Sequence, residues 1–264
     1  EIIGQIGGGE NNVDGDKVVK QLKKAEKDDD IKAVVLRVDS PGGAVAPSQE
    51  MYKAVKRLKA KGKPVVVSMG NLAASGGYYV SAPASWIVAN AGTLTGSIGV
   101  IFQHFGLHGI LETVKVEETT IKSGKYKDTG SPYRPFSDTD REVMQGLSDD
   151  IYGQFVKDVA EGRGLKEEDV RQIAEGRIYT GKRAAELKLV DEIGTYDDAI
   201  AKAWDLAKQT GEPKVQLPGK ERDFSLRELM RGAFQGAAQG ASEGVRSAVA
   251  PSAGMQFLAP ELVR

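Results

Sequence analysis

Short runs of β-branched residues alternate with helix-like segments through the first third of the chain. Residues 31–38, 64–69 and 86–89 have the apolar pattern of buried strands, whereas residues 17–27 and 46–61 have the pattern of amphipathic helices. A chain that repeats strand and helix in this order folds around a mainly parallel sheet, because each intervening helix makes the crossover between parallel strands. The sequence therefore predicts an α/β fold.

The second half of the chain is predicted to be largely helical. A long amphipathic helix is expected over residues 137–161, with Ser137 as its N-cap and acidic residues in its first turn. Gly162 and Gly164 are expected to end this helix. Shorter helices are predicted at residues 166–175, 181–188 and 197–209.

Composition suggests a compact domain followed by an appendage. A chain of 264 residues with 40% hydrophobic and 28% charged residues can bury a sizeable core. After about Gly211 the composition changes, and residues 232–254 are dominated by Gly, Ala and Ser. We therefore expect a domain over residues 1–210 and a flexible or inter-subunit extension over residues 211–264.

Charge and cysteine content exclude several classes of function. Lys and Arg total 36 against 37 Asp and Glu, so no overall field attracts nucleic acid or an anionic membrane. The sequence contains no cysteine, which excludes thiol catalysis and cysteine-bound metal. No apolar run reaches the roughly 20 residues that cross a bilayer, so the chain as given is expected to be soluble. Its opening, Glu1–Ile6, has the pattern of a strand interior and predicts that upstream residues are missing.

Two glycine-containing turns follow predicted buried strands. They are Asp39–Gly43 and Gly70–Tyr79, and the second contains Ser75. Ligands of open parallel sheets bind at the carboxyl ends of the strands, so these turns are the first candidates for a site. Small residues around Ser75 would let a substrate approach the backbone, which suits a nucleophile beside an oxyanion hole. The equally weighted alternative is that Ser75 only caps a helix and the glycines only make turns.

A serine nucleophile needs a base, and the sequence offers few candidates. His104 could serve, although a structural role is favoured for it; its spacing to His108 lacks the glutamate of a metalloprotease helix, so no metal is predicted. Residues 121–136 form a loop that contains aromatic residues and proline. A lysine desolvated in such a loop could lose its proton and act as the base. From the residues alone, the three lysines of this loop are equally eligible: Lys122, Lys125 and Lys127.

Several separated motifs, taken in order, resemble the signal peptide peptidase A family of bacterial serine proteases. The similarity covers roughly residues 1–210. Its motifs are Asp39–Gly43, Gly70–Tyr79, Leu94–Val100, Lys122–Asp128, Gly176–Gly181 and Leu189–Gly194.

The resemblance implies a role for particular residues. It makes Ser75 the nucleophile and Lys127 the general base, with Ser97 orienting the lysine. It also implies an oxyanion hole from the backbone N–H groups of Gly42 and Gly76, and substrate contacts at Gly43 and Gly77. Because Ser75 and Lys127 lie on one chain, the sequence favours a complete site in each subunit.

The resemblance further implies a Clp-protease-like or crotonase-like α/β superhelix of ββα units, and the hydrolysis of remnant signal peptides after secretion. The implied assembly is a homo-oligomeric ring or dome, held to the bacterial membrane by an upstream anchor with the catalytic domain outside the cytoplasm. No cofactor, metal or nucleic acid is expected. The small apolar residues 247–250 raise the idea that the extension is itself a substrate, although a packing or disordered tail is favoured.

Three alternatives remain open at this stage. The first is a Clp-type peptidase that uses Ser75 with His104 and an aspartate. The second is a noncatalytic, ring-forming scaffold of the same fold. The third is an acyl-CoA enzyme of the crotonase group, in which the glycine turns would hold a thioester oxygen.

Overall fold

The computed structural model describes residues 1–7 and 12–218. Residues Glu1–Val215 form one compact unit, and Gln216–Arg264 form a second, of which only residues 216–218 are described. The idea that residues 247–250 are a substrate therefore concerns residues outside the described ones, and the expected extension lies almost entirely outside them. Among the described residues, no helix is both long enough and apolar enough to span a membrane.

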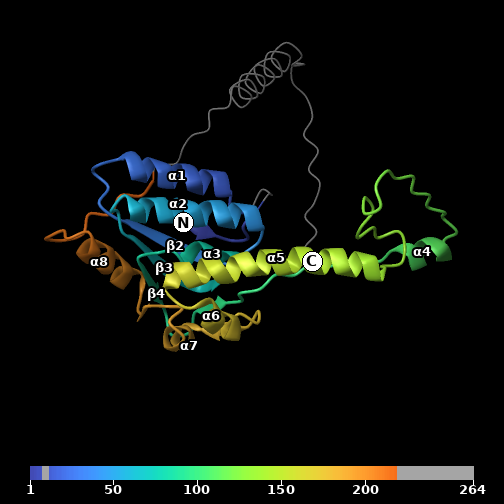
Figure 1. Cartoon of the computed structure of the whole chain (residues 1–264). Coiled ribbons are helices and arrows are strands. Elements are labelled where there is room, and N and C mark those ends of the chain that lie inside the picture. Colours follow the sequence, from blue (N-terminus) through green and yellow to red (C-terminus); the bar gives the residue numbers. More distant parts are fainter. Residues whose placement is uncertain (8–11, 219–264) are drawn as a thin grey trace, which may run out of the picture. The chain divides into compact units, whose positions relative to one another are not determined.

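The first unit contains alternating strands and helices (Figure 1). Its strands are β1 (Ile2–Ile3), β2 (Val34–Ser40), β3 (Val65–Ala74), β4 (Trp86–Ala89), β5 (Leu94–Gly96), β6 (Ile178–Thr180) and β7 (Glu192–Ile193). Its helices are α1 (Gly15–Lys27), α2 (Val45–Ala60), α3 (Gly76–Ser81), α4 (His108–Thr113), α5 (Asp138–Arg163), α6 (Glu167–Ile173), α7 (Gly181–Glu186) and α8 (Tyr196–Leu206).

The strands form one mainly parallel sheet in the order β1-β2-β3-β4-β7. β3 is long enough to pair with two strands on one side: Val66 lies opposite Trp86 of β4, and Leu72 lies opposite Leu94 of β5. β5 in turn pairs with β6 in the antiparallel direction. The sheet therefore divides along β3, and β5 leaves the main layer close to the carboxyl end of that strand.

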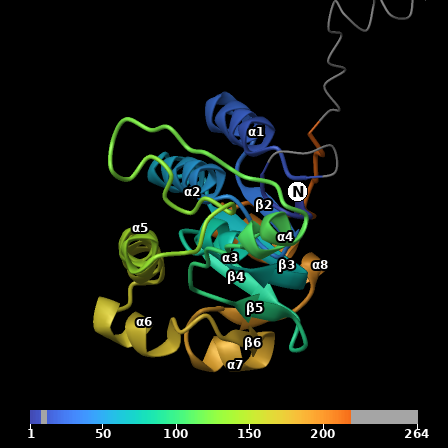
Figure 2. The same cartoon turned by 90° about the vertical axis from the view of Figure 1, so that its right-hand side faces the viewer.

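Both faces of the sheet are covered by helices. In Figure 2, α8 lies on the opposite side of the strands from α2 and α5. Successive residues of β3 point to opposite faces: Val65 and Val67 belong to the larger core, and Val66 packs with Ala199 and Ala203 of α8. Burial on both faces explains why β3 has the continuous apolar sequence of an interior strand.

The predicted strands and helices of the first third are confirmed, with one correction. β3 does not end at Met69; it continues to Ala74, so Gly70–Ala74 is strand rather than turn. The extension is stabilised by pairing with β5 and by Thr93, whose hydroxyl donates to the carbonyl of Gly70 at 2.7 Å. Small and polar residues in this stretch conceal the strand, because they lack the β-branched pattern.

The long helix of the second half is α5, and the predicted N-cap is confirmed. Ser137 and Asp140 form a reciprocal capping box. Gly162 does not end the helix, contrary to prediction; it lies inside α5, where a Cβ would be 2.6 Å from the carbonyl oxygen of Ala82. Gly164, with a φ of 65°, is the residue that ends it. Gly162 therefore permits a close approach between α5 and the chain that follows α3.

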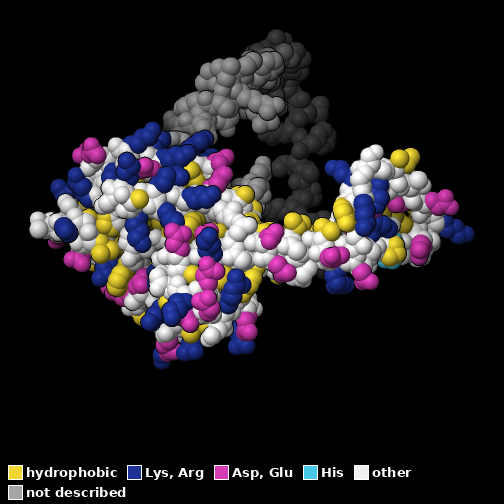
Figure 3. Space-filling view, in the orientation of Figure 1, with side chains coloured by type: hydrophobic (Ala, Val, Ile, Leu, Met, Phe, Trp, Pro, Cys, Tyr) yellow, Lys and Arg dark blue, Asp and Glu magenta, His cyan; other side chains and the backbone are white. Residues whose placement is uncertain are grey.

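The segment between β5 and α5 leaves the sheet. Gly99 still lies beside Gly176 near the sheet, and the chain then runs to the lobe that contains α4. In Figure 1 this lobe lies at the N-terminal end of α5, whereas α3 lies near the C-terminal end of that helix. Many apolar side chains of this segment are exposed, including Ile101 at 81%, Phe105 at 74% and Ile110 at 62%. Hydrophobic atoms are visible on the corresponding lobe in Figure 3. An exposed apolar surface of this kind indicates an interaction site.

Candidate active site

Ser75 stands on a sharp turn between β3 and α3. Its φ of 51° and ψ of −120° are unusual for a residue with a side chain, and its N–H donates to the carbonyl of Gly96 at 2.8 Å. The residue occupies the N-cap position of α3, but its hydroxyl makes no capping hydrogen bond. The hydroxyl of Ser75 therefore does not stabilise the start of α3 as a capping side chain would. The half-buried Ser75 hydroxyl thus stands on a turn with strained backbone angles, a feature that clusters at functional sites.

The turn after β2 packs directly against Ser75. Gly42 has a φ of 96°, and a Cβ added to it would lie 2.5 Å from the backbone nitrogen of Gly76 and 2.8 Å from the Cβ of Ser75. Gly43 is equally confined, since its Cβ would lie 1.9 Å from the carbonyl oxygen of Ile6. The two glycine turns predicted from the sequence thus meet at the carboxyl ends of neighbouring strands, and only glycine fits where they touch.

Backbone amides at this junction could hold an oxyanion. The N–H of Gly42 already donates to the buried hydroxyl of Ser40 at 3.1 Å. Among the hydrogen bonds of the described residues, none has the N–H of Gly43 or of Gly76 as its donor. A Cβ on Gly76 would lie 3.2 Å from the nitrogen of Gly43, so these two amides are close neighbours. Gly43 is therefore a stronger donor candidate than Gly42, which sequence reasoning placed in that role.

Ser97 lies at the same end of the sheet. It follows β5 with a φ of 50°, and its N–H donates to the carbonyl of Arg177 at 2.7 Å. Because the preceding residue, Gly96, accepts the N–H of Ser75, β5 brings Ser97 close to the nucleophile candidate along the backbone. Gly77 is also nearby, since its Cβ would lie 2.8 Å from the carbonyl oxygen of Ser40. Five of the predicted site glycines and serines are thus joined to Ser75 through backbone contacts: Gly42, Gly43, Gly76, Gly77 and Ser97.

The candidate bases lie elsewhere in the chain. Lys127 and His104 both belong to the segment of residues 99–137. His104 stacks against Phe136 with ring centroids 4.7 Å apart, and Lys127 is exposed. Among the described residues, no hydrogen bond or ion pair joins either side chain to Ser75.

The three lysines of residues 121–136 are no longer equivalent in the structure. Lys122 forms an ion pair with Asp128, and the amine of Lys125 lies 5.0 Å from the ring centroid of Tyr126. The amine of Lys127 makes no hydrogen bond, ion pair or ring contact with any described residue. Because the amine of Lys122 is already occupied by a carboxylate, Lys122 is the least suitable of the three to receive the proton of a serine.

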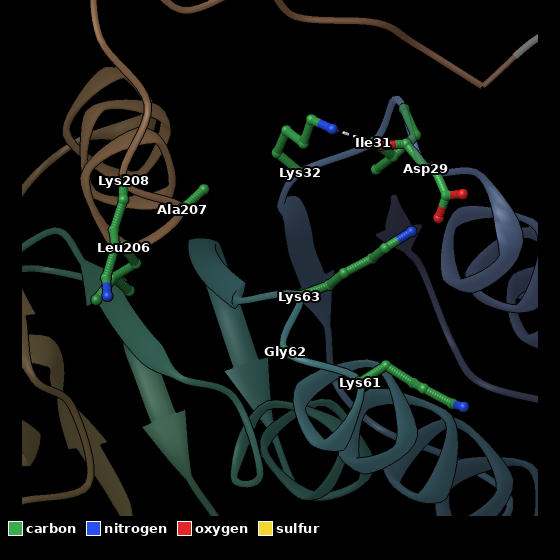
Figure 4. A pocket seen from close by; sticks show the side chains of 9 residues that line it. All are labelled: Asp29, Ile31, Lys32, Lys61, Gly62, Lys63, Leu206, Ala207 and Lys208. Carbon is green, nitrogen blue, oxygen red and sulfur yellow. Dashed lines mark hydrogen bonds between the residues drawn. The ribbon is translucent and has the colours of Figure 1, made fainter.

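A cavity of about 430 Å³ lies at the other end of the sheet. It is lined by residues that precede β2 and β3 and by the end of α8, including Lys32, Lys61, Lys63 and Lys208. In Figure 4 these lysine side chains do not converge. The amine of Lys63 instead donates to the carbonyl of Ala25 at 2.8 Å, just before the end of α1. The cavity is therefore separate from the glycine turns and gathers no catalytic groups.

Two family models match the sequence. The model described as "Clp protease" matches residues 3–89, which contain β1 to β4. The parallel sheet covered by helices agrees with this match, and the predicted α/β fold of the Clp-protease type is confirmed. A solved structure of a ClpP1 variant from Listeria monocytogenes is 16% identical with a TM-score of 0.48, covering 75% of this chain and 91% of that one.

Several proteases are considerably more similar to this chain in sequence than the ClpP1 variant is. A Synechocystis protein named as a protease is 47% identical over 75% of this chain and 70% of its own length. Protease 4 of Salmonella typhi is 41% identical over 75% of this chain but only 32% of its own. The chloroplastic serine protease SPPA of Arabidopsis thaliana is 34% identical over 82% of this chain and 32% of its own. The chain thus spans about a third of the length of the last two.

The second family model covers more than half of the chain. Described as "Peptidase family S49", it matches residues 57–210, a range that contains Ser75, Ser97 and Lys127. This match and the Synechocystis relative independently support the family resemblance seen in the sequence. The chain belongs to peptidase family S49.

Proposed function

We propose that this protein is a serine endopeptidase that hydrolyses signal peptides left after secretion, with Ser75 as the nucleophile and Lys127 as the general base. The observation that carries the proposal is the strained turn at Ser75, packed against the glycines of the turn after β2. The amides of Gly76 and of the Gly42–Gly43 turn would stabilise the oxyanion that forms when the Ser75 hydroxyl attacks a peptide carbonyl.

In the proposed reaction, the neutral amine of Lys127 takes the proton of the Ser75 hydroxyl as Oγ attacks the peptide carbon. The lysine then returns that proton to the leaving amine, and a water molecule hydrolyses the acyl-enzyme by the same route. Ser97 would donate a hydrogen bond that orients the lysine. Substrate entry would exclude water from the site, and a dry environment favours the neutral form of an amine, which the reaction needs.

The length of α5 decides whether Lys127 can reach Ser75 of the same chain. At one end, Tyr79, which follows Ser75 in α3, donates a hydrogen bond to Asp158. At the other end, Asp140 holds Arg134, which in turn holds Asp128 beside Lys127. The helical rise between Asp140 and Asp158 is about 27 Å, far beyond the reach of a lysine side chain. Within one chain, Ser75 is thus connected to the C-terminal part of α5, and Lys127 is connected to its N-terminal end.

We therefore infer that the site is completed between copies of the chain, with Lys127 of one copy reaching Ser75 of a neighbour. The exposed apolar side chains of residues 99–116 would supply the contact surface. Ring assembly is consistent with the Clp-like fold. A ring formed by one repeated heterologous contact would give every copy the same completed site.

An active-site probe tests the proposed nucleophile. A fluorophosphonate is expected to label wild-type protein at Ser75 and to leave Ser75→Ala unlabelled, with peptide mapping identifying the modified residue. Peptides with small apolar side chains beside the scissile bond are expected to slow the labelling by competition. Ser81→Ala is a suitable control, because its buried hydroxyl donates to the carbonyl of Gly77 and lies outside the proposed reaction.

Failure of the probe to react would favour the noncatalytic scaffold. Slower labelling of Ser75 in the presence of coenzyme A would favour the acyl-CoA alternative. Either result would overturn the proposed function.

A further inference from the structure

Arg134 lies at the centre of a network in the segment that carries the proposed base. Its Nε donates to the carboxylate of Asp128 at 2.9 Å, and its Nη2 donates to the backbone carbonyl of the same residue, also at 2.9 Å. Nη2 also donates to Asp140 Oδ1 at 2.8 Å, and Nη1 donates to Asp140 Oδ2 at 2.5 Å. Nη1 donates in addition to the backbone carbonyl of Pro135 at 3.1 Å. One planar guanidinium thus joins two carboxylates and two peptide groups, which a lysine could not reproduce.

Asp140 anchors this network to α5. Its side chain is 2% exposed, and it also accepts hydrogen bonds from the N–H and the hydroxyl of Ser137, at 2.9 and 2.7 Å. The N–H of Gly130 donates to it at 3.3 Å. The carboxylate is therefore surrounded by donors from the helix cap and from the loop. It fixes Arg134 relative to the first turn of α5.

Asp128 carries the network to the residue next to Lys127. Its carboxylate pairs with both Arg134 and Lys122, and its carbonyl accepts the N–H of Ser131 at 3.0 Å as well as Nη2 of Arg134. On the other side, the N–H of Lys127 donates to the carbonyl of Gly124 at 3.2 Å. The backbone is thus held both before and after position 127, while the Lys127 amine itself makes no hydrogen bond, ion pair or ring contact with the described residues.

We propose that Arg134 is a positioning residue of the reaction: together with Asp128 and Asp140 it fixes the backbone from which Lys127 extends toward Ser75 of a neighbouring copy. This inference rests on the proposed function, since it assigns a role to the surroundings of the proposed base. A general base must lie within hydrogen-bonding distance of the proton that it removes. A long side chain attached to a loosely held loop would reach that position only a small fraction of the time.

The network also suits the chemistry of a neutral amine. Asp128 is the acidic residue nearest to Lys127 in sequence, and a carboxylate without partners would compete with the serine for the lysine amine. Arg134 and Lys122 occupy it instead. Arg134 and, secondarily, Lys122 lower the pKa of Asp128 to about 2. The carboxylate therefore stays ionised at neutral pH, and the network would weaken as the carboxylate takes up a proton at low pH.

The test is the substitution Arg134→Lys, which keeps the charge and removes the planar fork. We expect the second-order rate constant for fluorophosphonate labelling of Ser75 to fall by about 10- to 100-fold, because a misplaced base slows activation of the serine. The final labelled fraction and KM for a peptide should stay at wild-type values. Arg141→Lys is the matched control, since Arg141 lies over the ring of Phe136 in the same segment and takes no part in the network.

Different outcomes separate the possible failures. An Arg134→Lys protein that labels at the wild-type rate would refute the positioning role. A lower labelled fraction with an unchanged rate constant would also refute it, because it would mean that Arg134 only maintains folded protein. If Arg134→Lys does not fold, Asp128→Asn provides the same readout with the Arg134–Asp140 pair intact.

A third variant separates this inference from the proposed function. If Lys127→Ala labels as fast as wild type, then the proposed base is wrong. If Lys127→Ala is slow, Arg134→Lys is expected to cause no further loss in that background, because its effect acts through Lys127. An equal further loss there would refute the positioning role while leaving the proposed base in place.

Discussion

Lys127→Ala is expected to abolish peptide hydrolysis, with a loss in kcat of about 10⁴-fold or more, as for removal of the base in serine proteases of other types. The reason is that the Ser75 hydroxyl is a weak nucleophile until a base removes its proton. The measurement is the cleavage rate of an apolar peptide at saturating concentration, with assembly checked by size-exclusion chromatography.

Neighbouring residues supply the controls for this prediction. Lys125→Ala lies in the same loop and should retain full activity, because its amine contacts the ring of Tyr126 instead of a reacting group. His104→Ala should also remain active, since His104 packs on Phe136. The opposite pattern, in which His104→Ala is inactive and Lys127→Ala is active, would support a Clp-type histidine mechanism and contradict the present account.

Gly42→Ala is expected to lower kcat/KM by about 10²-fold or more, comparable to the loss of an oxyanion donor. The new methyl group would lie 2.5 Å from the nitrogen of Gly76 and 2.8 Å from the Cβ of Ser75, so the two turns would have to separate. Separation would move the amides of Gly43 and Gly76 away from the developing oxyanion. Peptide cleavage and the rate of fluorophosphonate labelling measure this effect.

Gly62→Ala separates the effect of contact from the effect of backbone conformation. Gly62 has a φ of 77°, in the same positive region as Gly42, but no atom lies within 4 Å of its added Cβ. This control should lose about 1 kcal/mol of stability to urea and retain activity, because only left-handed strain is introduced. Equal losses of activity in both variants would show that contact with Ser75 is not what makes Gly42 necessary.

The parts of the fold that sequence predicts are those with a strong local signal. β-branched runs identified β2, the first half of β3, and β4, and the capping pattern at Ser137 identified the start of α5. β5, β6 and β7 span only three, three and two residues, so their formation depends on pairing with distant strands. Gly162 was misjudged because its role is a close approach to Ala82, which no local pattern reveals.

The site was predictable to the extent that it depends on the sheet. Parallel strands end at the same edge, so the turns at Gly42 and Ser75 could be expected to meet. The position of Lys127 relative to Ser75 could not be predicted, because it depends on the 26-residue helix α5 that lies between the lysine loop and the proposed nucleophile. The hydrogen bond from the N–H of Gly42 to the Ser40 hydroxyl could not be predicted either, since it forms only when the turn folds. Arg134 was missed because an arginine between two aspartates on a charged loop has no distinctive sequence signal.

The central claim is that an active site takes its serine from one copy of the chain and its lysine from another. It is tested most directly by mixing two inactive proteins, Ser75→Ala and Lys127→Ala, after dissociation and reassembly. Each mixed assembly would contain some junctions with an intact serine opposite an intact lysine. We predict that an equal mixture recovers about a quarter of the wild-type activity, as random neighbours in a ring require. A mixture that stays inactive, while wild type carried through the same treatment recovers, would contradict the account.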